Sequence, residues 1–200
     1  MTRILRLLLV LLLLAGATAR AAGDVESYAK KISSLIDPAK LATLGARGAD
    51  SRVEKYVALL AEGKANGAAP KKVAAKAVAL AGMKGKAAKL TAEAMLRNLT
   101  IAERLGCLDS KVLAEMHRGR APTVGRGPYR GQELSVDHII PRAVAPELDN
   151  VIANLELMPL KMNEEKNATI TTRQVDLARK LHQAGLLSSK GLKAVERHRK

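Results

Sequence analysis

Residues of the kind that hydrolyse phosphodiesters lie close together in the last third of the chain. Asp137 and His138 are adjacent, and Asn154, Asn163 and Lys166 follow. An imidazole titrates near neutral pH and suits the task of activating a water molecule. A hard divalent cation held by oxygen ligands suits the second task, which is to stabilise the leaving oxygen. These residue types therefore indicate metal-assisted hydrolysis of a phosphate ester.

The segments around these residues differ from the rest of the chain in their hydrophobic pattern. Residues 134–140 are predicted to form a strand that ends at Pro141, and residues 154–158 a second strand that ends at Pro159. Residues 160–166 follow as a short helix. The sequence thus predicts a strand, a connection, a second strand and a helix.

The alternation of side chains along a strand separates the two central residues. Asp137 and His138 are neighbours on the first strand, so they are expected to project to opposite faces. One of them can then hold a metal ion while the other faces water. A residue of the helix must supply a second metal ligand, and Asn163 is placed for that.

The same segments resemble the HNH (ββα-metal) nucleases. The pattern D-H-I-x-P begins at Asp137, N-L-x-L begins at Asn154, and N-x-x-K begins at Asn163, in the order that the family has. Nine positions separate Asn154 from Asn163, as is usual in that family. The resemblance covers about residues 125–170.

The resemblance implies a role for each residue that matches the motif. His138 would be the general base, and Asn154 would hold the loop by hydrogen bonds and so orient His138. Asp137 and Asn163 would bind one divalent cation, Mg²⁺ or Mn²⁺ in preference to Zn²⁺ or another transition metal. Asn167, four positions after Asn163, would be a further and weaker metal ligand.

Two features depart from the family pattern. The chain has a single cysteine, so the cysteine pairs that bind a structural zinc in many family members are missing, and flanking helices must hold the site. Glu164 and Glu165 stand where basic residues are usual, which weakens the local attraction for phosphate.

The composition indicates a polyanionic partner. The chain has 34 Lys and Arg residues against 19 Asp and Glu, a formal charge of +15. It has three Tyr and no Trp or Phe, which argues against base stacking. Seven lysines and no acid lie between positions 64 and 89. We interpret them as an arm that faces phosphate, the alternative being an ordinary solvated helical surface.

Four further basic residues flank the motif. Arg126, Arg130, Arg142 and Lys166 are candidates for contact with the nucleic-acid backbone, and ordinary surface charge is the alternative for each.

The N-terminus has the order of a secretory signal. Arg3 and Arg6 precede an apolar run at 7–15, and small residues follow at 16–19. We predict a signal peptide over residues 1–19, because the run is shorter than a bilayer-spanning helix requires; an uncleaved membrane anchor is the alternative. A periplasmic or secreted protein with no stable membrane partner after cleavage is expected.

The segments on either side of the nuclease core are predicted to be helical. Residues 20–118 form a Lys- and Ala-rich helical region, 119–170 the nuclease core, and 171–200 the C-terminal helices. Within the first region, Ser51 and Glu54 are spaced as a capping box. The expected fold class is α+β and mostly helical, with a small ββα-metal core. Whether the first region forms a separate domain is left open.

The sequence therefore predicts an exported, metal-dependent HNH endonuclease of low sequence specificity. The resemblance favours DNA over RNA as the substrate and leaves RNA open. The main alternative is a non-catalytic basic protein of the cell envelope that binds nucleic acid. A third hypothesis is a cationic interaction protein in which the motif is coincidental.

Overall fold

The computed structural model describes residues 25–165 and 169–199 of the chain. It shows an α+β fold that is mostly helical, which confirms the predicted class. Residues 25–36 are helical, and the later elements are α2 (Pro38–Leu41), α3 (Asp50–Ala65), α4 (Pro70–Leu80), α5 (Gly85–Arg104), α6 (Ser110–His117), β1 (Leu134–His138), the 3₁₀ turns η1 (Pro146–Leu148) and η2 (Ile152–Asn154), β2 (Leu155–Pro159), α7 (Leu160–Glu165), α8 (Thr172–Gln183) and α9 (Ser189–Arg197).

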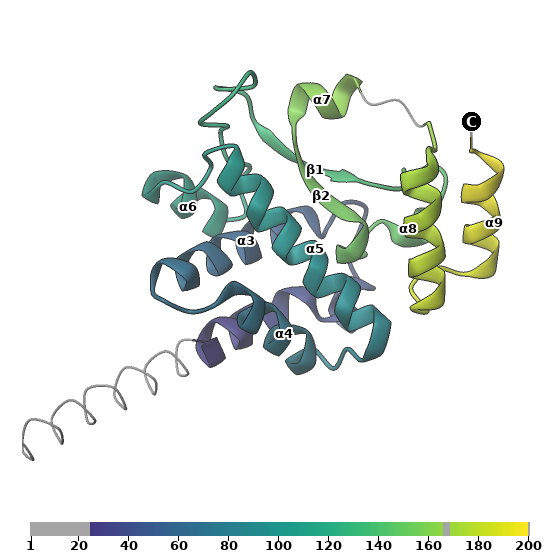
Figure 1. Cartoon of the computed structure of the whole chain (residues 1–200), viewed down its shortest axis with the longest axis horizontal. Helices are drawn as coiled ribbons and strands as arrows, with labels where there is room; N and C mark the ends of the chain where they lie inside the picture. The colour runs from purple at the N-terminus through teal and green to yellow at the C-terminus, as the bar shows by residue number, and fades with distance from the viewer. Residues whose placement is uncertain (1–24, 166–168, 200) are drawn as a thin grey trace, which may run out of the picture.

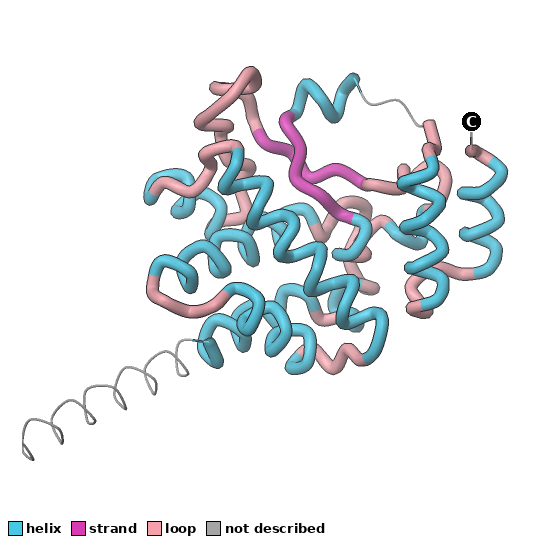
Figure 2. Tube along the Cα trace, in the orientation of Figure 1, coloured by secondary structure: helices cyan, strands magenta, loops and turns pink. Residues whose placement is uncertain are grey.

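The two strands form an antiparallel sheet that lies between two groups of helices (Figures 1 and 2). The long helix α5 crosses the middle of the molecule and contacts β2. Helices α8 and α9 pack against each other on one side, while α3, α4 and α6 lie on the other. Helix α7 follows β2 directly and packs on both strands.

The strands end at slightly different places than the sequence predicted. β1 stops at His138, before Ile140, because the side chain of Asn154 takes over the hydrogen bonds of Ile140. β2 begins at Leu155 and includes Pro159, which is tolerated at the end of a strand where no ladder N–H is needed.

The capping box predicted at Ser51 and Glu54 is wrong. Helix α3 begins at Asp50 with Ala49 as its N-cap, and no side chain caps it locally. Instead, the Oδ1 of Asn150, from the connection between the strands, accepts a hydrogen bond from the Ala49 N–H at 3.0 Å. A distant residue therefore fixes this helix start, and Glu54 is buried within the helix.

The two faces of the sheet differ in character. One face is apolar and packs into the core of the helical region; its residues are Leu134, Val136, Leu155 and Leu157. The register places Asp137 opposite Glu156 and Ser135 opposite Met158, and these four residues share the other face because side chains alternate. The strand pair thus presents a polar face.

The packing of the apolar face bears on whether the first helical region, residues 20–118, forms a separate domain. A continuous cluster of buried side chains runs from Tyr28, in the first helix described, to Leu157 in β2. The first helical region and the strands therefore share one core. A second cluster joins Ile140 and Leu148 to Val175 of α8 and Val195 of α9.

The predicted signal peptide, residues 1–19, lies outside the described residues. Among those that the structure describes, no helix is both long enough and apolar enough to cross a membrane.

Candidate active site

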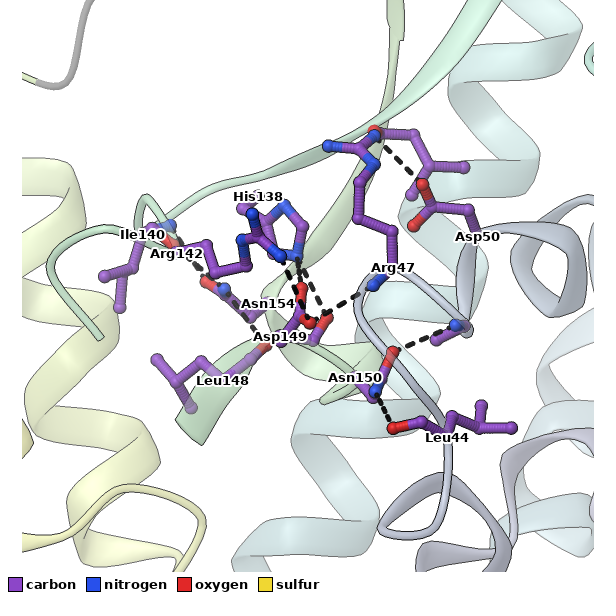
Figure 3. A network of polar contacts seen from close by, with 12 residues as sticks. Leu44, Arg47, Asp50, His138, Ile140, Arg142, Leu148, Asp149, Asn150 and Asn154 are labelled. Atoms are coloured by element: carbon purple, nitrogen blue, oxygen red, sulfur yellow. Dashed lines mark hydrogen bonds and ion pairs between the residues drawn. The ribbon is translucent and has the colours of Figure 1, made fainter. Parts of the chain in front are cut away.

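His138 ends β1 and has only 5% of its surface exposed. Its Nε2 is 2.9 Å from the main-chain carbonyl oxygen of Asp149 and 3.0 Å from the carboxylate Oδ1 of the same residue (Figure 3). The hydrogen-bond geometry favours the carbonyl, and the carboxylate lies beside it. Both atoms only accept hydrogen bonds, so Nε2 carries the proton. In a neutral ring the lone pair is then on Nδ1.

Asp149 is in turn held by two arginines. The main-chain N–H of Arg47 donates to Asp149 Oδ2 at 3.1 Å, and Nη1 of Arg142 lies 3.9 Å from the same oxygen (Figure 3). The carboxylate is thus fixed beside the ring, where it can stabilise a positive charge on His138.

Asn154 closes the connection between the strands. It is fully buried, its Oδ1 accepts from the Ile140 N–H at 2.9 Å, and its Nδ2 donates to the Ile140 carbonyl at 3.1 Å. A longer contact of 3.5 Å reaches the Leu148 carbonyl. The loop-closing hydrogen bonds expected of Asn154 are therefore present, and they fix the chain that immediately follows His138.

Asn163 joins α7 to the polar face of the sheet. Its Nδ2 donates to Ser135 Oγ at 3.0 Å, and Ser135 Oγ donates to the Met158 carbonyl at 3.1 Å. Ser135 and Asp137 lie two positions apart on β1, so they project from the same face. Asn163 and Asp137 thus come from the helix and the strand to one side of the sheet.

Glu156 shares this face but is already neutralised. Its Oε2 lies 2.6 Å from Nη2 of Arg173 and 3.8 Å from Nε of Arg97. Burial, first of all, lowers the pKa of Arg97, and the Glu156 carboxylate opposes that change. Glu156 therefore serves the packing of α5 and α8 against β2 rather than an open ligand position.

The donor atoms fit a hard cation. The Asp137 carboxylate and the Asn163 amide each carry oxygen atoms of the kind that such a cation binds, and the bond to Ser135 uses the amide nitrogen. Mg²⁺ is commonly bound through one or two protein oxygens while it keeps several waters. Within the described part of the chain, no three His, Cys, Asp or Glu side chains are grouped as a metal would require. Asn167 lies outside the described residues.

The predicted basic contacts separate into two places. Arg142 is exposed and lies at the His138 site through its approach to Asp149. Arg126 and Arg130 are exposed and line a hollow with Lys64 at the C-terminal end of α5. Lys166 lies outside the described residues.

Sequence reasoning missed Asp149, Arg47 and Asp50 as neighbours of His138. Nη2 of Arg47 lies 2.9 Å from Asp50 Oδ2 at the start of α3. Burial is the main cause that raises the pKa of Asp50, while Arg47 and His138 act in the opposite direction. Arg47 and Asp149 are 102 positions apart, and no spacing rule connects residues so distant in the sequence.

Comparison with known proteins adds no relative. No family model matches the chain, and no curated protein or solved structure is significantly similar to it. The fold and the site define an α+β protein in which His138, at the end of β1, contacts Asp149 of the strand connection. Asp137 of β1 and Asn163 of α7 lie to one side of the sheet. The functional argument rests on that arrangement.

Proposed function

We propose that the protein is a metal-dependent endonuclease of the HNH type, in which β1, β2 and α7 form a ββα-metal core. The observation that carries the proposal is the hydrogen bond from Asn163 to Ser135. It brings α7 to the face of β1 from which Asp137 projects, and His138 is the next residue of that strand. A base and two oxygen ligands thus come from one short unit.

In the proposed reaction, Nδ1 of His138 takes a proton from the attacking water. The Asp149 carboxylate, 3.0 Å from Nε2, stabilises the charged ring that results. Asn154 keeps the chain after His138 in place. Asp137 and Asn163 would hold one divalent cation, which supplies Lewis-acid stabilisation of the leaving oxygen when it is bound.

The charge distribution supports nucleic acid as the substrate class. The net charge of +15 provides attraction to phosphate without sequence choice. Arg142 and Arg173, with side chains 50% and 61% exposed, flank the β1–β2 strand pair and can contact the phosphate backbone of a nucleic acid. We propose DNA ahead of RNA, low sequence specificity, and action in the periplasm or outside the cell.

The test is nicking of supercoiled plasmid by the purified protein with Mg²⁺, Mn²⁺ or Zn²⁺, and with EDTA. His138→Ala should abolish nicking with every metal, while binding of plasmid in a gel shift is retained. Asn163→Ala should raise the metal concentration needed for half-maximal rate. Arg118→Ala, at the end of α6, is a matched control that removes one exposed positive charge away from the hairpin. Nicking that survives EDTA or His138→Ala would overturn the proposal.

A non-catalytic nucleic-acid-binding protein is the second candidate. The observation in its favour is that His138 is almost fully buried, which limits access of water to the ring. It predicts a salt-sensitive gel shift shared by wild type and His138→Ala, and no cleavage of DNA or RNA with any metal.

A further inference from the structure

The loop between α2 and α3 has an unusual backbone conformation. Arg47 has a φ of 57°, and among the described residues it is the one non-glycine position with positive φ. Such a conformation is strained for a residue with a side chain and persists where the surroundings impose it. A side chain at Gly48 would place its Cβ 2.7 Å from the Leu44 Cβ, so the loop is tightly wound.

This conformation lets one residue reach two parts of the candidate site. The main-chain N–H of Arg47 donates to Asp149 Oδ2 at 3.1 Å. Its guanidinium Nη2 donates at 2.8 Å to the carbonyl of Val136, which lies two residues before His138 on β1. Arg47 therefore contacts both the strand that carries His138 and the residue that contacts its ring.

The residue after Asp149 binds the same loop from the other side. Asn150 accepts from the Ala49 N–H at 3.0 Å, and its Nδ2 donates to the Gly45 carbonyl at 3.1 Å and the Leu44 carbonyl at 3.3 Å. Asp149 and Asn150 are thus fixed to the loop by both side chains. Arg47 also forms an ion pair with Asp50. That ion pair requires neither the positive φ of Arg47 nor its bond to Val136, so it does not account for them.

We infer that Arg47 and Asp149 are positioning residues for His138. They fix the proton on Nε2 and the orientation of the ring, so that Nδ1 is the basic nitrogen. The helical region before residue 119 therefore supplies a part of the active site besides a share of the core. The expected effect on catalysis rests on the proposed function, whereas the effect on the ring does not.

Two variants test the inference with little change in shape. Asp149→Asn keeps the size of the side chain and the main-chain carbonyl but removes the charge. Arg47→Gly keeps the N–H that contacts Asp149, accepts a φ of 57° without strain, and removes the guanidinium. Arg47→Lys retains the charge and one donor and should recover part of the lost function. Arg118→Ala is the matched control for the loss of a cation.

The first readout needs no substrate. Correlations between the ring protons and ring nitrogens of His138 in NMR spectra report which nitrogen carries the proton. We expect the Nε2–H tautomer in the wild type and in Arg118→Ala. We expect a mixture in Asp149→Asn and Arg47→Gly, because each change loosens the contacts of Arg47 with Asp149 or Val136 that keep the Asp149 carbonyl against Nε2. A wild-type ring protonated on Nδ1, or an unchanged tautomer in both folded variants, would overturn the inference.

The second readout is steady-state cleavage of a short DNA duplex. We expect kcat to fall on the order of 100-fold in both variants with little change in KM, as for a misplaced base. Thermal unfolding shows whether each variant is folded. A purely structural role would lower the stability without a selective fall in kcat at nearly constant KM. A kcat within about twofold of wild type in both, in protein that His138→Ala inactivates, would contradict the inference. If wild type does not cleave at all, the proposed function fails, and the tautomer still decides the positioning role.

Discussion

At the scale of single residues, Glu54 is the carboxylate whose surroundings are most unfavourable to its charge. It lies in α3 with 5% of its surface exposed, and its Oε2 has no hydrogen-bond partner among the described residues. Burial, and then the charges of Asp50 and Glu133, raise the pKa of Glu54 to about 7, while Lys55 opposes the change. The folded protein therefore prefers this side chain protonated.

The raised pKa sets the sign of a pH dependence. An unfolded glutamate has its ordinary pKa of 4.5, so the folded state binds more protons between about pH 4.5 and pH 7. The free energy of unfolding should fall as the pH rises through this window, by up to about 3 kcal/mol from this residue. Glu54→Gln should equal the wild type near pH 4.5 and exceed it at pH 8. Urea denaturation across this range measures the difference.

The matched control is Glu93→Gln, which removes an exposed carboxylate from α5. It should follow the wild-type stability curve. A Glu54→Gln curve parallel to wild type at every pH would show that Glu54 is ionised without penalty in the folded protein.

At the scale of elements, two side chains of α5 cover the edge of β2 that does not pair with β1. Arg97 donates to the Leu155 carbonyl at 3.1 Å, and Asn98 makes the other contacts. Asn98 is fully buried, its Oδ1 accepts from the Leu157 N–H at 3.0 Å, and its Nδ2 donates to the Leu155 carbonyl at 3.1 Å. The same Nδ2 donates to the Tyr56 hydroxyl at 2.6 Å, which links α3 to the pair. The amide thus imitates a third strand and joins the helices to the sheet.

Replacement of Asn98 by Ala should therefore be costly. It removes the Asn98 bonds to the buried Leu157 N–H and the Tyr56 hydroxyl, and loss of a partner costs a buried polar group about 1–3 kcal/mol. The Leu155 carbonyl keeps its bond from Arg97 Nη2 at 3.1 Å. We expect a loss of about 3 kcal/mol in the free energy of unfolding, together with faster hydrogen exchange of the Leu157 amide. Asn66→Ala, which breaks a part-buried bond to the Tyr28 hydroxyl, is the control. Unchanged exchange at Leu157 in Asn98→Ala would refute this account of the sheet edge.

The elements also show what the sequence could and could not predict. Alternating residues ended by Pro141 and Pro159 identified both strands, because those signals are local. The partners of β2 on α5 lie 57 to 59 positions away, and nothing in the local pattern marks Asn98 as their source. The failed capping box has the same cause, since Asn150 acts on the start of α3 from across the fold.

The candidate site also has features that the sequence could predict and features that it could not. Strand alternation predicted that Asp137 and His138 project from opposite faces. The resemblance to the HNH nucleases implied that Asn163 shares a site with Asp137. The contacts of His138 to Asp149, and of Asp149 to Arg47, depend on how a loop of the helical region packs against the strand connection. Such contacts follow from the shared core and have no local signal.

At the scale of the whole molecule, the lysine-rich segment is part of the core and not a detachable arm. Val73, Ala74, Ala77 and Val78 of α4 are buried, so deletion of residues 64–90 would remove core packing together with charge. Lys64 pairs with Glu103 and Lys76 with Glu26. The exposed lysines with no ion pair among the described residues include Lys71, Lys72 and Lys84.

Lys71 and Lys72, the two of these lysines on α4, also lie away from the candidate site. Helix α4 is at the opposite end of the molecule from α7 in Figure 1. If they contact phosphate, they do so on DNA that extends well beyond the hairpin. Their contribution should then appear in binding and its salt dependence, and not in the rate of the chemical step.

Substitution of Lys71, Lys72 and Lys84 by Gln therefore separates the two interpretations of this segment. Counterion release gives a slope of about −0.9 per phosphate contact in a plot of log K against log salt. Three lost contacts should make the slope shallower by up to about 2.7, with kcat at saturating DNA unchanged. Fluorescence anisotropy with a long duplex at several salt concentrations measures the slope.

The control is a second triple substitution with the same loss of charge, at Lys180, Lys190 and Lys193, which are exposed residues of α8 and α9. An equal effect in both triples would indicate a general charge effect, and no effect in the first would favour a solvated helical surface.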